Sequence, residues 1–198
     1  MTPQLHDRWL EQWLPKLRHA ATALPVLELG CDTGTDTQWL VERNFQVVAT
    51  DISAQALATC ARIAAPAHCL HHDLREPLPF AAGSFGAVIA SLCLHYFDWA
   101  TTARAAGEIR RCLAPQGLFL CRVNSVRDVL HGAGQGEEIE PGLYRQDARY
   151  AATKRFFRSE DLDRLFPPGE WRELSRREVT IGRYAQPKVA WEVALSPA

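Results

Sequence analysis

The fold is decided by one stretch near the start of the chain, Val26-Leu27-Glu28-Leu29-Gly30-Cys31-Asp32-Thr33-Gly34. Its first four residues predict a short strand, and the two glycines predict a turn that leads into a helix. In such a strand–turn–helix unit the backbone amides can approach an anionic group closely, and the helix dipole favours that group. A turn with two glycines can equally be a tight connection, so the surrounding sequence has to decide.

Strands and helices alternate outward from this stretch through the first two thirds of the chain. The expected strands are 26–29, 46–50, 67–71, 87–92 and 118–123. The expected helices are 36–44, 54–64 and 101–113, with Ser53 as the N-cap of the second. This alternation predicts a doubly wound α/β fold, in which a parallel sheet is covered by helices on both faces.

The two ends of the chain carry different patterns. Apolar residues at spacings of four predict an N-terminal helix over 4–21, which Pro15 should kink or split. Trp9 and Trp13 on this helix either belong to the core or form a flap over a ligand. At the other end, a helix at 159–166 precedes two segments, 178–184 and 188–195, whose alternation is typical of antiparallel strands.

The strand–helix rhythm breaks between residues 124 and 153, where Gly and polar residues are frequent. A connection of this length in a compact domain is usually a lid or a binding loop, so we expect a lid here. Lys154-Arg155, followed by Phe156-Phe157, either returns the chain to the core or is a solvated charged pair beside two buried rings. No repeat and no second core are visible, so residues 1–198 are interpreted as a single domain.

The composition excludes several classes of protein. Of the 198 residues 47% are hydrophobic and 23% are charged, which is ordinary for a folded domain, and the net charge of -1 gives no footprint for nucleic acid. No apolar run is long enough to cross a membrane and no signal peptide is visible, so we expect a cytoplasmic protein. The six cysteines are scattered, which favours structural thiols and no metal site.

Two acidic residues follow the next two expected strands. Asp51 closes the second strand, where a carboxylate can accept both hydroxyls of a ribose. Asp73 follows the third strand, where it could accept the amino group of an adenine ring, although it could equally be a turn residue. Ligands of such sheets bind at the carboxyl ends of the strands, so these acids and the glycine turn predict a nucleotide site.

With these motifs the chain resembles class I S-adenosylmethionine-dependent methyltransferases, in particular the small single-domain bacterial kind. The resemblance covers about residues 24–123 and rests on four motifs: Glu28–Gly34, Val47–Ser53, His72-Asp73-Leu74 and Phe85–Ser91. It implies a Rossmann-like sheet of seven strands, mostly parallel, with an antiparallel seventh strand between the fifth and the sixth. It also implies S-adenosylmethionine as the cofactor and transfer of its methyl group as the reaction.

The resemblance assigns roles to individual residues. Glu28 would hold the amino group of the cofactor's methionine part, Gly30 and Gly34 would let the backbone approach, and Asp51 would bind the ribose. The remaining cofactor-binding residues would be Cys31, Asp32, Ile52 on the adenine, Asp73 and Leu74 near its amine, and Ser91 and Leu92 along the methionine arm. Asp32 departs from the family pattern, which usually has Gly there, although Asp tolerates the left-handed region better than most residues.

The acceptor side is less defined. His95 could act as a base, since the pKa of histidine is ordinarily about 6.5, or His95 and Tyr96 could merely shape the pocket. We favour the second reading, because many methyl transfers need mostly proximity and alignment. The acceptor is expected to be a small molecule, neither nucleic acid nor membrane, and the oligomeric state is left open.

Two rival functions are weighed against the methyltransferase. A nicotinamide-dependent oxidoreductase would want G-x-G-x-x-G, which the order Gly30-Cys31-Asp32-Thr33-Gly34-Thr35 does not fit. A non-catalytic nucleotide-binding module would keep the fold without the activity, and Asp32 is the best support for that reading.

Overall fold

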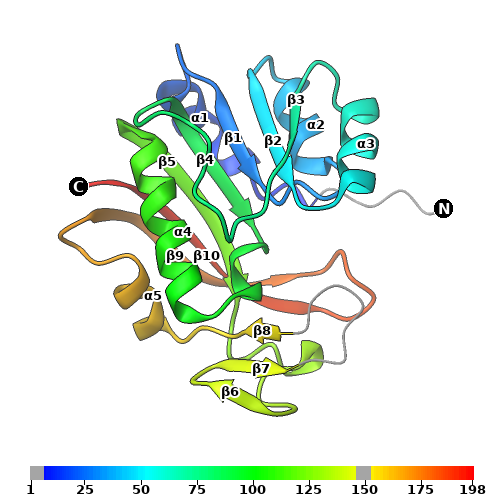
Figure 1. The fold of residues 1–198 in the computed structure, drawn as a ribbon, viewed down its shortest axis with the longest axis vertical. Coiled ribbons are helices and arrows are strands. Elements are labelled where there is room, and N and C mark those ends of the chain that lie inside the picture. The colour runs from blue at the N-terminus through cyan, green and yellow to red at the C-terminus, as the bar shows by residue number, and fades with distance from the viewer. Residues whose placement is uncertain (1–6, 146–152) are drawn as a thin grey trace.

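A seven-stranded sheet forms the centre of the computed structural model, which describes residues 7–145 and 153–198 (Figure 1). The strand order is β3-β2-β1-β4-β5-β10-β9. The strands are β1 (Val26–Leu29), β2 (Val47–Asp51), β3 (His68–His71), β4 (Phe85–Ser91), β5 (Leu113–Asn124), β9 (Trp171–Ile181) and β10 (Lys188–Pro197). Only β10 runs antiparallel to its two neighbours, β5 and β9. The expected mixed sheet of seven strands is confirmed.

Helices cover both faces of this sheet, because its central strands are apolar on both sides. On one face, η1 (Glu11–Trp13), α1 (Leu14–Ala20), α2 (Thr35–Val41) and α3 (Ala54–Ile63) pack on alternate residues of the strands. On the other face lie α4 (Trp99–Cys112) and α5 (Ser159–Leu165). Every residue of β1 is buried, as are the first six of β4. The carboxyl ends of these strands therefore sit on a rigid double-sided core.

The boundaries at both ends of the chain differ from the sequence-based expectation. The N-terminal α-helix begins at Leu14, not at residue 4, because Pro15 occupies its first turn, where a missing N–H costs nothing. Residues 4–6 of the expected helix lie outside the described residues. Near the other end, β9 begins at Trp171 rather than at 178, since its outer residues are mostly exposed and charged and give no apolar alternation.

The segment expected to be an irregular lid contains ordered structure. It holds the short helix η3 (Val129–His131) and two strands, β6 (Glu138–Glu140) and β7 (Leu143–Arg145), which form a small sheet with β8 (Thr153–Arg155). This sheet lies beyond the carboxyl ends of β4 and β5 (Figure 1). The Thr153 hydroxyl donates to the Tyr96 carbonyl over 2.8 Å and fixes β8 beside the chain that follows β4. Residues 146–152 of the expected lid lie outside the described residues.

Arg155 shows why this small sheet stays attached to the main one. Its side chain is buried, ion-paired with Glu140 and lies 5.5 Å from the centre of the Trp99 ring. Phe156 and Phe157 follow it into the core. Reading Lys154-Arg155 as a solvated charged pair was therefore wrong for Arg155, because Glu140 neutralises its charge inside the fold.

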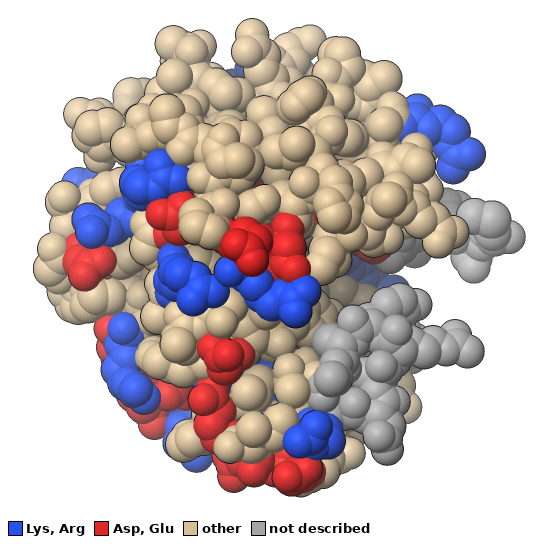
Figure 2. All heavy atoms as spheres, viewed as in Figure 1, with Lys and Arg blue, Asp and Glu red and all other residues tan. Residues whose placement is uncertain are grey.

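The surface carries charges of both signs. On the face drawn in Figure 2, Lys and Arg stand beside Asp and Glu across the middle and lower parts, while the upper part has few charged side chains. No patch of one sign covers this face. In the described part of the chain, no helix is long and apolar enough to span a bilayer.

Candidate functional site

The turn after β1 is shaped by two glycines with left-handed backbones. Gly30 has φ +64° and Gly34 has φ +89°. A Cβ added at Gly30 would lie 2.5 Å from Cys93 Cβ, and one at Gly34 would lie 2.6 Å from Cys60 Sγ. Both positions therefore require glycine, and the turn packs against Cys93, just after β4, on one side and against α3 on the other.

Asp32 takes the left-handed conformation that the sequence led us to expect, with φ +48°. Its side chain is exposed, and its backbone N–H donates to Asp51 Oδ2 over 2.9 Å. Partial burial and the neighbouring Asp51 carboxylate raise the pKa of Asp32, while Arg183 opposes that shift. The turn thus accommodates Asp at the position where the family pattern has Gly, at the cost of a backbone conformation that Gly adopts more easily.

Asp51 ends β2 and faces this turn. Its Oδ1 accepts the Ser53 N–H over 2.8 Å, and its Oδ2 accepts the Asp32 N–H. Each oxygen keeps a further lone pair for another donor. The next residue, Ile52, is 56% exposed although it is large and apolar. The Asp51 carboxylate could accept hydrogen bonds from a ribose, and the exposed Ile52 side chain beside it could pack on the flat ring attached to that ribose.

Glu28 lies buried under the turn, with 3% of its surface exposed. The Thr37 hydroxyl, from α2, donates to its Oε2 over 2.5 Å. Burial, and next the nearby Asp36 carboxylate, raise the pKa of Glu28 well above its usual range. Thr37 was not singled out in the sequence, where a lone Thr in a helix gives no signal.

Asp73 and Leu74 follow β3, but the Asp73 carboxylate is already engaged. Both of its oxygens accept hydrogen bonds from the Arg75 guanidinium, and Oδ1 also accepts the Arg75 N–H. These hydrogen bonds lower the pKa of Asp73. An adenine amine would therefore have to share the Asp73 carboxylate with Arg75. Leu74 packs against the core cluster under α4.

Ser91 is the last residue of β4, and Leu92 follows it in a strained conformation. Leu92 has φ +60°, which for a Leu costs on the order of 1–3 kcal/mol and is typical of binding sites. The Ser91 hydroxyl accepts from Arg122 Nε and Nη2 over 3.0 and 2.9 Å. Arg122 was missed in the sequence, although a single cation inside the apolar run 118–123 was a usable signal.

His95 and Tyr96 lie in η2 (Leu94–Tyr96), directly after β4. Their ring centres are 4.3 Å apart. His95 is 1% exposed, and burial, followed by Lys188 and Lys154, lowers its pKa well below the usual value. Burial raises the pKa of Tyr96 to about 12. Both side chains are therefore neutral at physiological pH, and His95 Nδ1 has no hydrogen-bond partner among the described residues.

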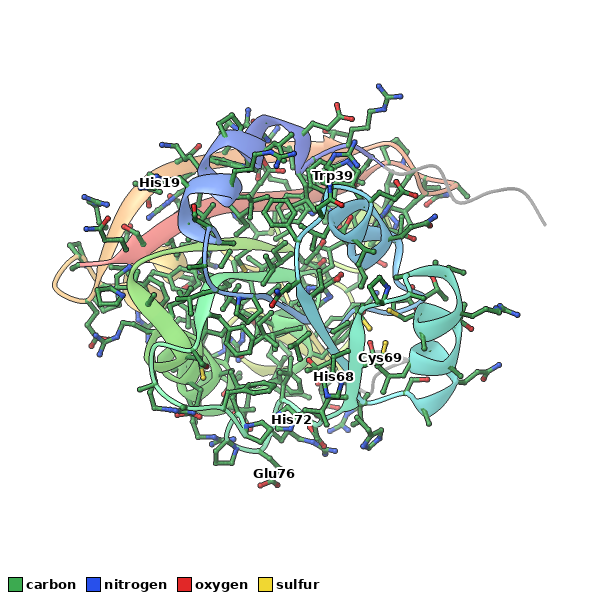
Figure 3. All side chains as sticks on the ribbon, turned by 90° about the horizontal axis from the view of Figure 1, so that it is seen from above. His19, Trp39, His68, Cys69, His72 and Glu76 are labelled. Atoms are coloured by element: carbon green, nitrogen blue, oxygen red, sulfur yellow. The ribbon has the colours of Figure 1, made fainter. Side chains whose placement is uncertain are left out.

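Potential metal ligands gather along the edge strand β3 without forming a site. Figure 3 shows His68, Cys69, His72 and Glu76 there, spread along the strand and the loop that follows it. In the described parts of the chain, no three His, Cys, Asp or Glu residues are placed to hold a metal ion. All six cysteines are free thiols and five of them are buried. Trp9 and Trp13 are buried in the core cluster under α1.

The site residues thus meet at the carboxyl ends of β1, β2 and β4, beside a glycine turn. Comparison with known proteins shows what this part of the chain is similar to. Residues 26–117 match the family model described as a methyltransferase domain. This match agrees with the resemblance of the motifs to class I S-adenosylmethionine-dependent methyltransferases.

Two curated proteins that are similar to this chain carry the same name. It is 32% identical over 94 residues to the malonyl-[acyl-carrier protein] O-methyltransferase of Enterobacter lignolyticus, which is 48% of this chain and only 36% of that protein. It is 28% identical over 182 residues to the enzyme of that name from Pectobacterium atrosepticum, covering 89% of this chain and 68% of the other.

A solved structure shows the same fold. The 1,6-didemethyltoxoflavin-N1-methyltransferase of Burkholderia thailandensis, with 1,6-didemethyltoxoflavin and S-adenosylhomocysteine bound, superposes with a TM-score of 0.70. The alignment has 20% identity and covers 97% of this chain and 80% of that one. At this identity the similarity concerns the fold alone.

Proposed function

We propose that this chain binds S-adenosylmethionine in the turn after β1 and transfers its methyl group to a small nucleophile. The observation that carries the proposal is the arrangement at the carboxyl ends of three strands. A glycine turn, the Asp51 carboxylate and the bare Ile52 side chain lie next to one another there. Ligands of doubly wound sheets bind at this edge.

The chemistry of these residues fits the cofactor. Asp51 retains lone pairs for two ribose hydroxyls, since each of its oxygens accepts only one backbone amide. Ile52 offers an apolar surface to an adenine ring. Glu28 lies under the turn, where its carboxyl can accept hydrogen bonds from an ammonium group. Asp73 fits less well, because Arg75 holds both of its oxygens.

In the reaction, this chain's residues bind and orient more than they react. When bound, S-adenosylmethionine supplies an electrophilic methyl group on sulfonium. Leu92 and Ser91 border the methionine arm, while His95 and Tyr96 form a neutral wall on the acceptor side. The small sheet of β6, β7 and β8 lies over this side and would exclude water. Alignment of the two reactants is the main contribution of such a site.

Calorimetric titration tests the cofactor assignment. We expect binding of S-adenosylmethionine and S-adenosylhomocysteine and none of NAD. Tight binding of NAD alone would establish the oxidoreductase instead. A protein that binds the adenosyl compounds but releases no S-adenosylhomocysteine with any acceptor would be a binding module. Acceptors should be screened one at a time by the release of S-adenosylhomocysteine. The screen should include small nucleophiles and malonyl-acyl-carrier protein, which is named for both curated relatives.

A further inference from the structure

A buried guanidinium lies beside the proposed site. Arg122, on β5, is 1% exposed. Two of its nitrogens donate to the Ser91 hydroxyl, and its Cζ lies 4.3 Å from the centre of the Trp9 ring. A buried cation of this kind is costly unless an anion compensates it. Among the described residues that anion is Asp7, whose Oδ2 lies 2.6 Å from Arg122 Nη1.

A second guanidinium shares the same carboxylate. Arg183, in the turn between β9 and β10, has its Nε 3.8 Å from Asp7 Oδ2. That Nε is buried and has no hydrogen-bond partner among the described residues. Asp7 therefore lies near two cations but is within hydrogen-bond distance of Arg122 only. An anion with two oxygens could accept hydrogen bonds from both guanidinium groups.

The position of this pair links it to the cofactor. Arg122 is anchored on Ser91, which borders the proposed methionine arm, and Arg183 acts on the ionisation of Asp32 in the glycine turn. Trp9, two residues after Asp7, donates from its Nε1 to Asp36 Oδ2 over 2.9 Å at the start of α2. The segment from Asp7 to Trp13 thus lies across the end of the site where a methionine carboxylate would come.

We propose that Arg122 and Arg183 form a carboxylate subsite and that Asp7 is an internal ligand which the cofactor's carboxylate replaces. This inference rests on the proposed function. Asp7 and an amino-acid carboxylate carry the same charge and the same two oxygens, so either can compensate the buried Arg122. Binding of the cofactor and docking of Asp7 are then competing events, and the N-terminal segment sets part of the apparent affinity.

The test uses two ligands and one substitution. 5′-Methylthioadenosine shares the adenosine and the thioether of S-adenosylhomocysteine but lacks the amino and carboxyl groups. Asp7→Asn should raise the affinity for S-adenosylhomocysteine by about three- to tenfold, since it removes a competitor that holds the subsite most of the time. The affinity for methylthioadenosine should not change. Arg183→Gln should weaken S-adenosylhomocysteine by about tenfold, the usual loss for one hydrogen bond to a charged group.

A matched control removes a carboxylate elsewhere. Asp163, on α5, has an exposed side chain that forms an ion pair with Arg176 of β9, and Asp163→Asn should change neither affinity. If Asp7→Asn weakens S-adenosylhomocysteine, Asp7 binds the cofactor's ammonium group and the inference is wrong. Unchanged affinity also overturns it. If the unmodified protein binds neither ligand, it is the proposed function that fails, so the two failures are distinguishable.

Discussion

Replacing Asp51 by Ala tests the proposed ribose contact most directly. A carboxylate that accepts two ribose hydroxyls contributes roughly 2–3 kcal/mol to binding, so S-adenosylhomocysteine should bind about 30- to 150-fold more weakly in calorimetric titration. The structure adds a second effect, because Asp51 also accepts the backbone amides of Asp32 and Ser53. Losing these two bonds should lower the free energy of unfolding by about 1–2 kcal/mol.

The effect on binding and the effect on stability are separated with a control at another carboxylate that accepts a backbone amide. Asp98 accepts the Thr101 N–H over 2.7 Å at the start of α4, so Asp98→Ala should lower the melting temperature in the same way. It should leave the affinity for S-adenosylhomocysteine unchanged. If Asp51→Ala loses stability like the control and keeps full affinity, Asp51 is a turn residue and the ribose assignment is refuted.

Three further substitutions follow from the site. Asp32→Gly should relieve a left-handed backbone and leave cofactor binding unchanged or tighter by up to about 1 kcal/mol, whereas a tenfold loss in calorimetry would make Asp32 a direct ligand. Glu28→Gln should weaken cofactor binding. It should also raise the melting temperature above that of the unmodified protein, and by more at pH 8 than at pH 5. The folded state holds the Glu28 proton more tightly than the unfolded state, so this residue costs stability as the pH rises above its ordinary pKa. His95→Gln should change turnover only modestly, whereas a large pH-dependent loss of turnover would identify a base. The substitution should also remove a loss of stability below about pH 6.5, because the unfolded state gains a proton there that buried His95 in the folded state does not.

The local pattern of the sequence was enough for the central elements. Apolar runs bounded by Gly, Pro and Asp predicted β1 at its observed bounds and β4 within two residues, because strands buried on both faces must be apolar throughout. Ser53 was expected to cap α3, and its hydroxyl accepts the Ala56 N–H. The seven-stranded order came from the resemblance of the motifs and not from any periodicity in the chain.

Contacts between distant segments could not be inferred in this way. Asp7 and Arg122 are 115 residues apart, and no pattern in either segment shows that they pair. The same holds for the small sheet of β6, β7 and β8, whose strands lie partly within the expected loop. A strand of three residues such as β6 is too short for its alternation to be recognised, and its position depends on partners such as Arg155.

The residues at the carboxyl ends of the strands could be identified from the chain itself, since strand ends follow from local turn chemistry. How those residues are used depends on the folded arrangement. It turned Asp51 towards two backbone amides, buried Glu28 beside Thr37 and brought Arg122 and Arg183 to one carboxylate. Burial and through-space charge depend on atoms that are distant in the chain, and these two quantities set the ionisation and the hydrogen-bonding capacity of every group in the site.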